Sequence, residues 1–295
     1  MARRAVGGAL LFIVLAAIDG IAARPAQAPA PPPTSVAAVL DRLGAYLNAY
    51  GEQLSRAVAN ERYKQASRNG NNYDEAILDS EFGIIKVPNY EGWLGFRDVL
   101  KVNGKVVQDH ETRLQELLFT PSPAALEQAR RIAEESARHN IGAIKRNINN
   151  PALVLELFDR RNQPRMHFVK TDDDTIDERH VWVLKFDELK KPTLIQTPQA
   201  RDVPTEGSLW VDPIDGVLVR AEVNIKGFFM AGGFGASKAQ MRVYFREDPR
   251  LKFWVPSRLT ETYQVAGLGE ITGDATYTNY RLFGTSTQEQ FNEVR

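Results

Sequence analysis

Apolar residues near the start of the chain recur at three- and four-residue spacing. Between residues 35 and 58 they form one continuous stripe, which predicts an amphipathic helix. Ser35 precedes the stripe and is a good helix cap, whereas Gly51 is a place where the helix could be interrupted. The stripe is typical of a helix that packs on its own domain.

From Glu61 onward the apolar positions change to a period of two, which predicts β-strands. Strands over 76–87 and 93–102 are separated by turn clusters at 69–72 and 88–92. Asn103-Gly104 is a strong two-residue hairpin signal before another short apolar run. Residues 61–108 are therefore predicted to form an antiparallel meander.

A helical block over 112–150 interrupts the strands. Ser122 caps a helix that has Pro123 in its first turn, and Asn140-Ile141-Gly142 breaks the pattern. The remainder is mostly strand, predicted over 153–158, 165–170, 181–186, 193–196, 208–211, 217–225, 239–245, 253–265 and 274–283. Many strands with short turns and grouped helices predict an antiparallel α+β fold in a single domain over 35–295.

The N-terminus is typical of an export signal. Arg3 and Arg4 precede an apolar run over 5–18, which is too short for a permanent membrane helix. Cleavage after Ala23 or Ala28 is expected, so 1–28 is predicted to be a signal peptide and 29–34 a proline-rich tether. An uncleaved anchor is the alternative. We expect a periplasmic or secreted protein that is soluble after cleavage.

Composition removes several classes of function. The 37 basic and 37 acidic residues cancel, so no positive surplus is available to bind the phosphates of a nucleic acid. The chain contains no cysteine, which excludes disulfides, thiol chemistry and a lipid anchor on cysteine. No cofactor is expected.

A glycine- and phenylalanine-rich loop is the most unusual segment. A phosphate-binding loop needs Gly directly before Lys and Ser or Thr directly after it, but here Ser237 precedes Lys238. The segment 227–238 is instead predicted to be either a flap over an apolar cavity or a hairpin loop that packs on the core. Its apolar side chains are Phe228, Phe229, Met230 and Phe234.

No catalytic or metal-binding arrangement stands out. The acidic stretch Asp172–Asp174 with Asp177 and Glu178 offers oxygen ligands for Ca²⁺, but its spacing favours a solvated turn. No Gly-x-Ser-x-Gly motif is present. We expect neither a metal site nor enzymatic activity. None of the histidines has the spacing of a metal-binding helix: His110, His139, His167 and His180.

Aromatic residues recur on the predicted strands. They could fill a closed core, or they could line a ligand groove on the concave face of an open sheet. From strand alternation we predict that the residues at the ligand or over the cavity mouth are Trp93, Phe96, Trp182, Phe186, Trp210, Phe228, Phe229, Met230 and Phe234.

Several strand motifs together resemble a known superfamily. They are the run 182–186, Leu209-Trp210-Val211-Asp212 with the following 215–220, and the late strand over 275–281. This layout is similar to the outer-membrane lipoprotein-sorting and lipoprotein-carrier (LolA-type) superfamily over roughly 40–285, and to uncharacterised exported bacterial proteins. The resemblance implies a curved antiparallel half-open β-barrel with helices covering the concave face. The chain is longer than the short carriers, and its helical block is more extensive.

The resemblance also implies a function. We expect a non-catalytic protein that binds an acyl chain, lipid or lipoprotein in an apolar cavity and has a lipid or an acylated protein as its partner. Transient contact with a membrane is a further expectation. The alternatives are a structural or interaction module of the cell envelope with a filled core, and a hydrolase of unknown substrate.

Overall fold

The computed structural model describes residues 35–55, 57–86, 92–107, 123–142, 146, 149–197, 200–227 and 237–282. All of these belong to one compact unit, Pro32–Arg295. The predicted signal peptide over 1–28, the tether over 29–34 and part of the predicted helical block lie outside the described residues. So do Phe228, Phe229, Met230 and Phe234 of the predicted flap.

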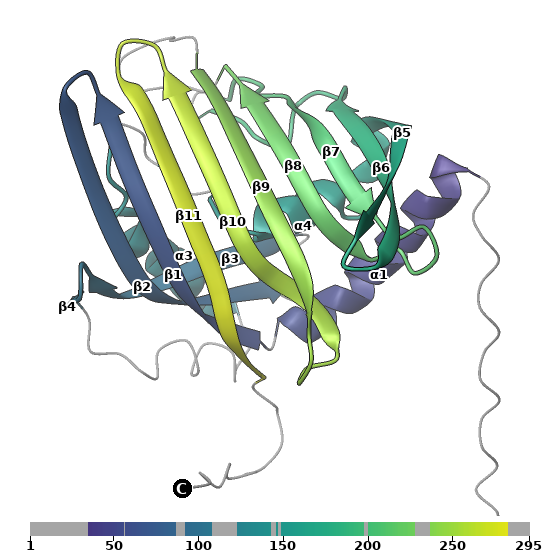
Figure 1. Ribbon diagram of the computed structural model, residues 1–295, viewed down its shortest axis with the longest axis horizontal. Helices are drawn as coiled ribbons and strands as arrows, with labels where there is room; N and C mark the ends of the chain where they lie inside the picture. The colour runs from purple at the N-terminus through teal and green to yellow at the C-terminus, as the bar shows by residue number, and fades with distance from the viewer. Residues whose placement is uncertain are drawn as a thin grey trace, which may run out of the picture. The chain divides into compact units, whose positions relative to one another are not determined.

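The strands form one antiparallel sheet of eleven strands in the order β4-β3-β2-β1-β11-β10-β9-β8-β7-β6-β5 (Figure 1). Two meanders, β1–β4 and β5–β11, meet where the first strand pairs with the last. The strands are β1 (Ala57–Asn69), β2 (Asn72–Lys86), β3 (Trp93–Val102), β4 (Lys105–Val106), β5 (Met166–Ile176), β6 (Arg179–Glu188), β7 (Thr205–Val211), β8 (Leu218–Lys226), β9 (Ser237–Asp248), β10 (Phe253–Val265) and β11 (Gly269–Leu282). The open antiparallel sheet with its helices confirms the predicted antiparallel α+β architecture and is consistent with a curved half-barrel.

Three described α-helices contact this sheet: α1 (Val36–Leu54), α3 (Pro123–Ala137) and α4 (Ala152–Phe158). Figure 1 shows them behind the strands. Ser35 caps α1, as predicted, by accepting a hydrogen bond from the amide of Ala38 at 3.3 Å. α1 runs through Gly51 without interruption.

The predicted hairpin at Asn103-Gly104 is confirmed, since both residues have positive φ (50° and 77°) between β3 and β4. A second tight turn lies at Asp177 and Glu178, also with positive φ, between β5 and β6. The acidic run Asp172–Asp174 lies inside β5 and not in a solvated turn. The carboxylate of Asp173 pairs there with the ammonium group of Lys170, and Nε2 of His180 lies 3.1 Å from its Oδ1.

Two predicted strands are wrong. Residues 153–158 form the helix α4, because five of its seven residues are buried and a short apolar run carries no clear period. Residues 193–196 contribute only an isolated bridge between Gln196 and Asp202. The loop there is held by side chains instead: Thr193 and Asp202 bond one another and nearby backbone groups.

The face of the sheet that meets the helices has two chemically different regions. Beneath α1 and α4 it is apolar, with Phe186, Leu209 and Val243 fully buried. Beneath α3 and the segment that follows it, the same face carries Glu61, Arg97 and Glu261, each at most 7% exposed. Alternation puts both sets on one face, so the core passes from apolar to charged along the sheet.

Candidate functional site

The apolar region is built from the shared sides of α1, α4 and the strands from β6 to β10. α4 contributes Val154, Leu155 and Phe158, all with no exposed surface. The ring of Phe158 meets the ring of Phe186 edge to face, with centroids 4.9 Å apart. This is a favoured geometry for aromatic pairs, and it joins α4 to β6, while α4 also contacts β3 and α1. α1 adds Leu43, Leu47 and Leu54, which are at most 1% exposed.

Three of the predicted ligand-binding residues are buried against the chain itself. Phe186 lies under Phe158, and Phe96 packs so closely on Gly83 that a Cβ there would be 2.9 Å from its ring. Trp93 reaches the end of α4, where its indole nitrogen donates to Asp159 at 3.3 Å. Trp93 therefore contacts the C-cap of α4 from β3, and Phe186 contacts α4 from β6. These two strands lie near opposite edges of the sheet.

The other two described candidates are partly exposed. Trp210 lies on the opposite face from Leu209 and Val211, and Arg220 stacks on its ring at 3.8 Å. Its indole nitrogen donates to Asp174 at 3.1 Å. Trp182 lies under the ammonium group of Lys170 at 4.4 Å. The structure does not gather the five described candidates into one site, and their predicted role in ligand binding stays a prediction.

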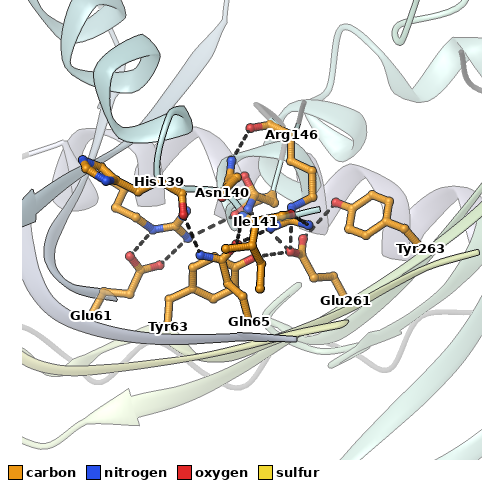
Figure 2. A network of polar contacts seen from close by, with 11 residues as sticks. Glu61, Tyr63, Gln65, His139, Asn140, Ile141, Arg146, Glu261 and Tyr263 are labelled. Atoms are coloured by element: carbon orange, nitrogen blue, oxygen red, sulfur yellow. Dashed lines mark hydrogen bonds and ion pairs between the residues drawn. The ribbon is translucent and has the colours of Figure 1, made fainter. Parts of the chain in front are cut away.

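A network of buried polar side chains occupies the charged region (Figure 2). Glu61 on β1 receives two hydrogen bonds from the guanidinium of Arg97 on β3, with Nη2 at 2.7 Å from Oε1. Their side chains are 0% and 7% exposed. A fork-on-fork pair of this kind is the strong form of ion pair, and it also satisfies both buried carboxylate oxygens.

A second buried pair lies beside the first. Nε of Arg146 is 3.5 Å from Oε1 of Glu261, and both side chains are fully buried. The hydroxyls of Tyr63 and Tyr263 donate to the same carboxylate, the latter at 2.9 Å. Arg146 also donates to Oε1 of Gln65. The carboxylate of Glu261 is thus contacted by Tyr63 from β1, by Tyr263 from β10 and by Arg146 from the segment after α3.

The network fastens that segment to the sheet. The side-chain amide of Gln65 donates to the carbonyl of His139 at 3.1 Å and accepts from the amide of Ile141 at 3.2 Å. Asn140 donates to the carbonyl of Arg146 at 2.8 Å, and Figure 2 shows these groups converging over the strands. Ser136 at the end of α3 donates to the carbonyl of Arg97.

Electrostatics in the network favour one protonation state. Burial raises the pKa of the Tyr63 hydroxyl above its ordinary value, and the negative charge of Glu261 raises it further. Burial alone lowers the pKa of Arg97, but the charge and hydrogen bonds of Glu61 outweigh this effect and raise it. Arg97 therefore stays charged, and Tyr63 and Tyr263 stay neutral, so both tyrosine hydroxyls can donate.

Glycines make room for the network. Gly273 on β11 pairs with Glu261 on one side and Gln65 on the other. A Cβ at Gly273 would lie 2.6 Å from Oε1 of Glu261 and 2.7 Å from the ring of Tyr63. The missing side chain therefore creates the space into which the carboxylate and the phenol ring fit.

The arrangement holds its carboxylates rather than exposing them. Both oxygens of Glu61 and of Glu261 accept hydrogen bonds from buried donors, which suits structural charge pairs. In the described part of the chain no three metal-ligating side chains come together. His139, His167 and His180 lie apart, after α3 and on β5 and β6, while His110 lies outside the described residues. None of the described helices has the length and apolar character needed to cross a membrane.

Sequence reasoning missed this network. A signal was present, because Glu61 and Glu261 are each followed two residues later by a tyrosine on the same strand face. A charged residue in phase with buried aromatic residues points to a buried pair.

No protein-family model matches the chain, and no curated protein matches it. Solved structures with a similar arrangement include an outer membrane lipoprotein-sorting protein domain from Vibrio parahaemolyticus, at 12% identity and a TM-score of 0.38 over 86% of this chain and 96% of that one. A LolA superfamily protein from Nitrosomonas europaea has 12% identity and a TM-score of 0.34, over 85% and 95%. A DUF1329 family protein from Desulfovibrio piger has 9% identity and a TM-score of 0.37, over 88% and 97%. Two of these names match the superfamily that the sequence motifs resemble.

Proposed function

We propose that the protein binds an acyl chain, a lipid or an acylated protein between α1, α4 and the apolar region of the sheet. The observation that carries this proposal is the nature of the contact between α4 and the strands. All five buried side chains of α4 are apolar, and the helix is only seven residues long. A helix of this length is unstable alone, so its position depends on apolar burial.

Apolar contacts of this kind are non-directional and exchangeable. An acyl chain can offer methylene surface to Phe186, which now contacts Phe158 of α4, and to the neighbouring buried residues Leu184 and Leu209. The charged region is different, because its buried ion pairs fix the segment after α3 in one geometry. We therefore propose that the ligand enters at the apolar region, while the charged region keeps its geometry.

The direct test is native mass spectrometry of protein purified from its own host, followed by solvent extraction of any bound molecule. Titration with N-phenyl-1-naphthylamine, a neutral fluorophore that brightens in apolar surroundings, gives a second readout. Saturable fluorescence that extracted lipid displaces is the expected result. A ligand-free mass together with no saturable fluorescence would contradict the proposal.

Leu189→Ser is the matched control for this titration. Leu189 is 68% exposed, so it is a place where the fluorophore could bind on the outside. The substitution is expected to leave the saturable signal unchanged. A signal that disappears with Leu189 would show that the probe reports surface binding and not the proposed site.

The wider proposal keeps the expectations from the sequence. The protein acts as a non-catalytic carrier in the periplasm or medium after removal of its signal peptide, with Phe228, Phe229, Met230 and Phe234 over the mouth of the site. Sequencing the N-terminus of the protein secreted by its host tests the first part. A mature chain that still begins at Met1 would contradict it.

A second candidate is a structural or interaction module of the envelope with a filled core. The observation that favours it is that Phe186 is fully buried and its ring packs against Phe158 of the chain itself. The same mass measurement separates the two functions, because a filled module is purified without ligand.

A further inference from the structure

Two tyrosines on α1 place polar groups in the apolar region without satisfying them. Tyr46 and Tyr50 are one turn apart, with ring centroids separated by 5.5 Å. Both hydroxyl oxygens are buried, and neither has a hydrogen-bond partner among the described residues. A buried hydroxyl without a partner costs stability, so native proteins rarely keep one without a reason.

The surroundings of Tyr50 are aromatic. Its ring meets Phe245 and Phe253 edge to face, at centroid distances of 6.5 and 6.3 Å. Burial raises the pKa of the Tyr50 hydroxyl well above its ordinary value. The group therefore stays protonated, with a hydrogen to donate.

Tyr46 lies nearer the surface. Its side chain is partly exposed although its oxygen is buried. Burial also raises its pKa, while the positive charge of Arg179 opposes the rise. The Arg179 side chain is 26% exposed and stacks over Trp254 at 5.3 Å. Tyr46 is therefore the hydroxyl that the charge of Arg179 reaches, and Tyr50 is the more deeply buried of the two.

Other buried tyrosines show the contrast. The hydroxyl of Tyr280 donates to the carbonyl of Pro256 at 2.7 Å, and those of Tyr63 and Tyr263 donate to Glu261. The hydroxyl of Tyr277 also has no hydrogen-bond partner among the described residues, but Glu61 lies near it, and burial together with that negative charge raises its pKa. Each of these four hydroxyls therefore has a carbonyl or a carboxylate of the chain nearby, whereas Tyr46 and Tyr50 face aromatic rings and lack an acceptor within the described chain.

We infer that the hydroxyls of Tyr46 and Tyr50 donate hydrogen bonds to the ester or amide carbonyl oxygens of an acylated ligand seated under α1. This inference rests on the proposed function and narrows its ligand class. A hydrocarbon chain needs only apolar surface, whereas an ester-linked chain also brings carbonyl acceptors into that surface. Two free donors in an apolar layer match a ligand of the second kind.

The test compares two probes that differ only in their carbonyl groups: dipalmitoyl phosphatidylcholine and its ether analogue di-O-hexadecyl phosphatidylcholine. Each is used to displace N-phenyl-1-naphthylamine from wild type and from Tyr46→Phe/Tyr50→Phe. Wild type is expected to bind the ester about tenfold more tightly than the ether, since each hydrogen bond contributes a few-fold. The double variant is expected to lose this preference and to keep its affinity for the ether.

A ligand-free readout checks the same hydroxyls. The double variant is expected to have a higher melting temperature than wild type, because it no longer buries two unsatisfied hydroxyls. Tyr73→Phe is the control, since Tyr73 is 56% exposed and its hydroxyl bonds Glu75. It is expected to change neither the ester preference nor the melting temperature.

Three results would overturn the inference. They are equal binding of ester and ether by wild type, an ester preference that survives in the double variant, and a lower melting temperature in the double variant. If the fluorophore itself does not bind and the purified protein also carries no ligand, the proposed function fails together with the inference. If the fluorophore binds and the ester preference is missing, only the inference fails.

Discussion

At the scale of single residues, the molecule places charge in its core and pairs each charge with an opposite one, although Nε of Arg146 has no hydrogen-bond partner in the described part of the chain. Glu61, Arg97, Arg146 and Glu261 form two buried ion pairs whose net charge is zero. Removing water from such groups is costly, and the opposite charges with their hydrogen bonds offset that cost. The loss of one member should therefore be far more damaging than the loss of an exposed pair.

Arg97→Leu should lower the free energy of unfolding by about 3–5 kcal/mol, because it leaves Glu61 charged and buried without its partner. Urea unfolding monitored by circular dichroism measures this. The double variant Glu61→Leu/Arg97→Leu should recover much of the loss. Arg62→Ala is the control, since it breaks the exposed pair with Asp79 and should cost at most about 1 kcal/mol. Equal losses of unfolding free energy for Arg97→Leu and Arg62→Ala would show that the buried pair is no more important for stability than the exposed one.

Gly273→Ala should also be destabilising, by about 1–3 kcal/mol, because the new methyl group would push against the Glu261 carboxylate and the Tyr63 ring. Thr276→Ala, an exposed position on the same strand, is the comparison. Thermal melts of both variants measure the effect. If Gly273→Ala has the same melting temperature as wild type, the network is able to shift and does not depend on this space.

At the scale of elements, turn chemistry explains which parts of the fold the sequence predicts. The hairpin at Asn103-Gly104 and the helix after Ser35 carry strong local signals, and both are confirmed. α4 does not, because a seven-residue run with six apolar residues fits a strand or a helix equally well, and packing against the sheet decides. The buried network was beyond sequence reasoning for a related reason. Tyr63 and Glu261 meet across 198 positions of the chain.

α1 and α4 should have to move relative to each other for a ligand to enter. Gly44→Cys/Arg160→Cys tests this, since a Cβ at Gly44 would lie 3.1 Å from the Cβ of Arg160, near the range for a disulfide. The chain has no other cysteine to interfere. The oxidised double variant should bind N-phenyl-1-naphthylamine more slowly than the same protein after reduction. Identical rates before and after reduction would show that entry does not require the two helices to part.

At the scale of the whole molecule, buried tyrosines are spread across the described fold. Burial raises the pKa of Tyr50, Tyr63, Tyr263, Tyr277 and Tyr280 above the ordinary value of 10. The folded state therefore holds these protons more tightly than the unfolded chain does. Stability from this source is complete below about pH 10 and falls as the pH rises beyond it.

We expect a cooperative alkaline unfolding transition above about pH 10, with a loss of up to about 1.4 kcal/mol per pH unit for each tyrosine that titrates only when unfolded. Tyrosinate absorbance and circular dichroism should change together as the pH is raised. Should most of the tyrosinate signal develop near pH 10 while the circular dichroism stays native, the phenols would be accessible and not buried as described.

The pairing of β1 with β11 has a consequence for biosynthesis. The strands from β1 to β4 and those from β5 to β10 can each form as they leave the ribosome, but only β11 joins them, and it includes residues 269–282. Until then each half presents an unpaired edge, on β1 and on β10. Assembly must wait for a contact between distant parts of the chain, which makes folding slow. A chain that ends before Gly269 would leave both edges open and is expected to aggregate.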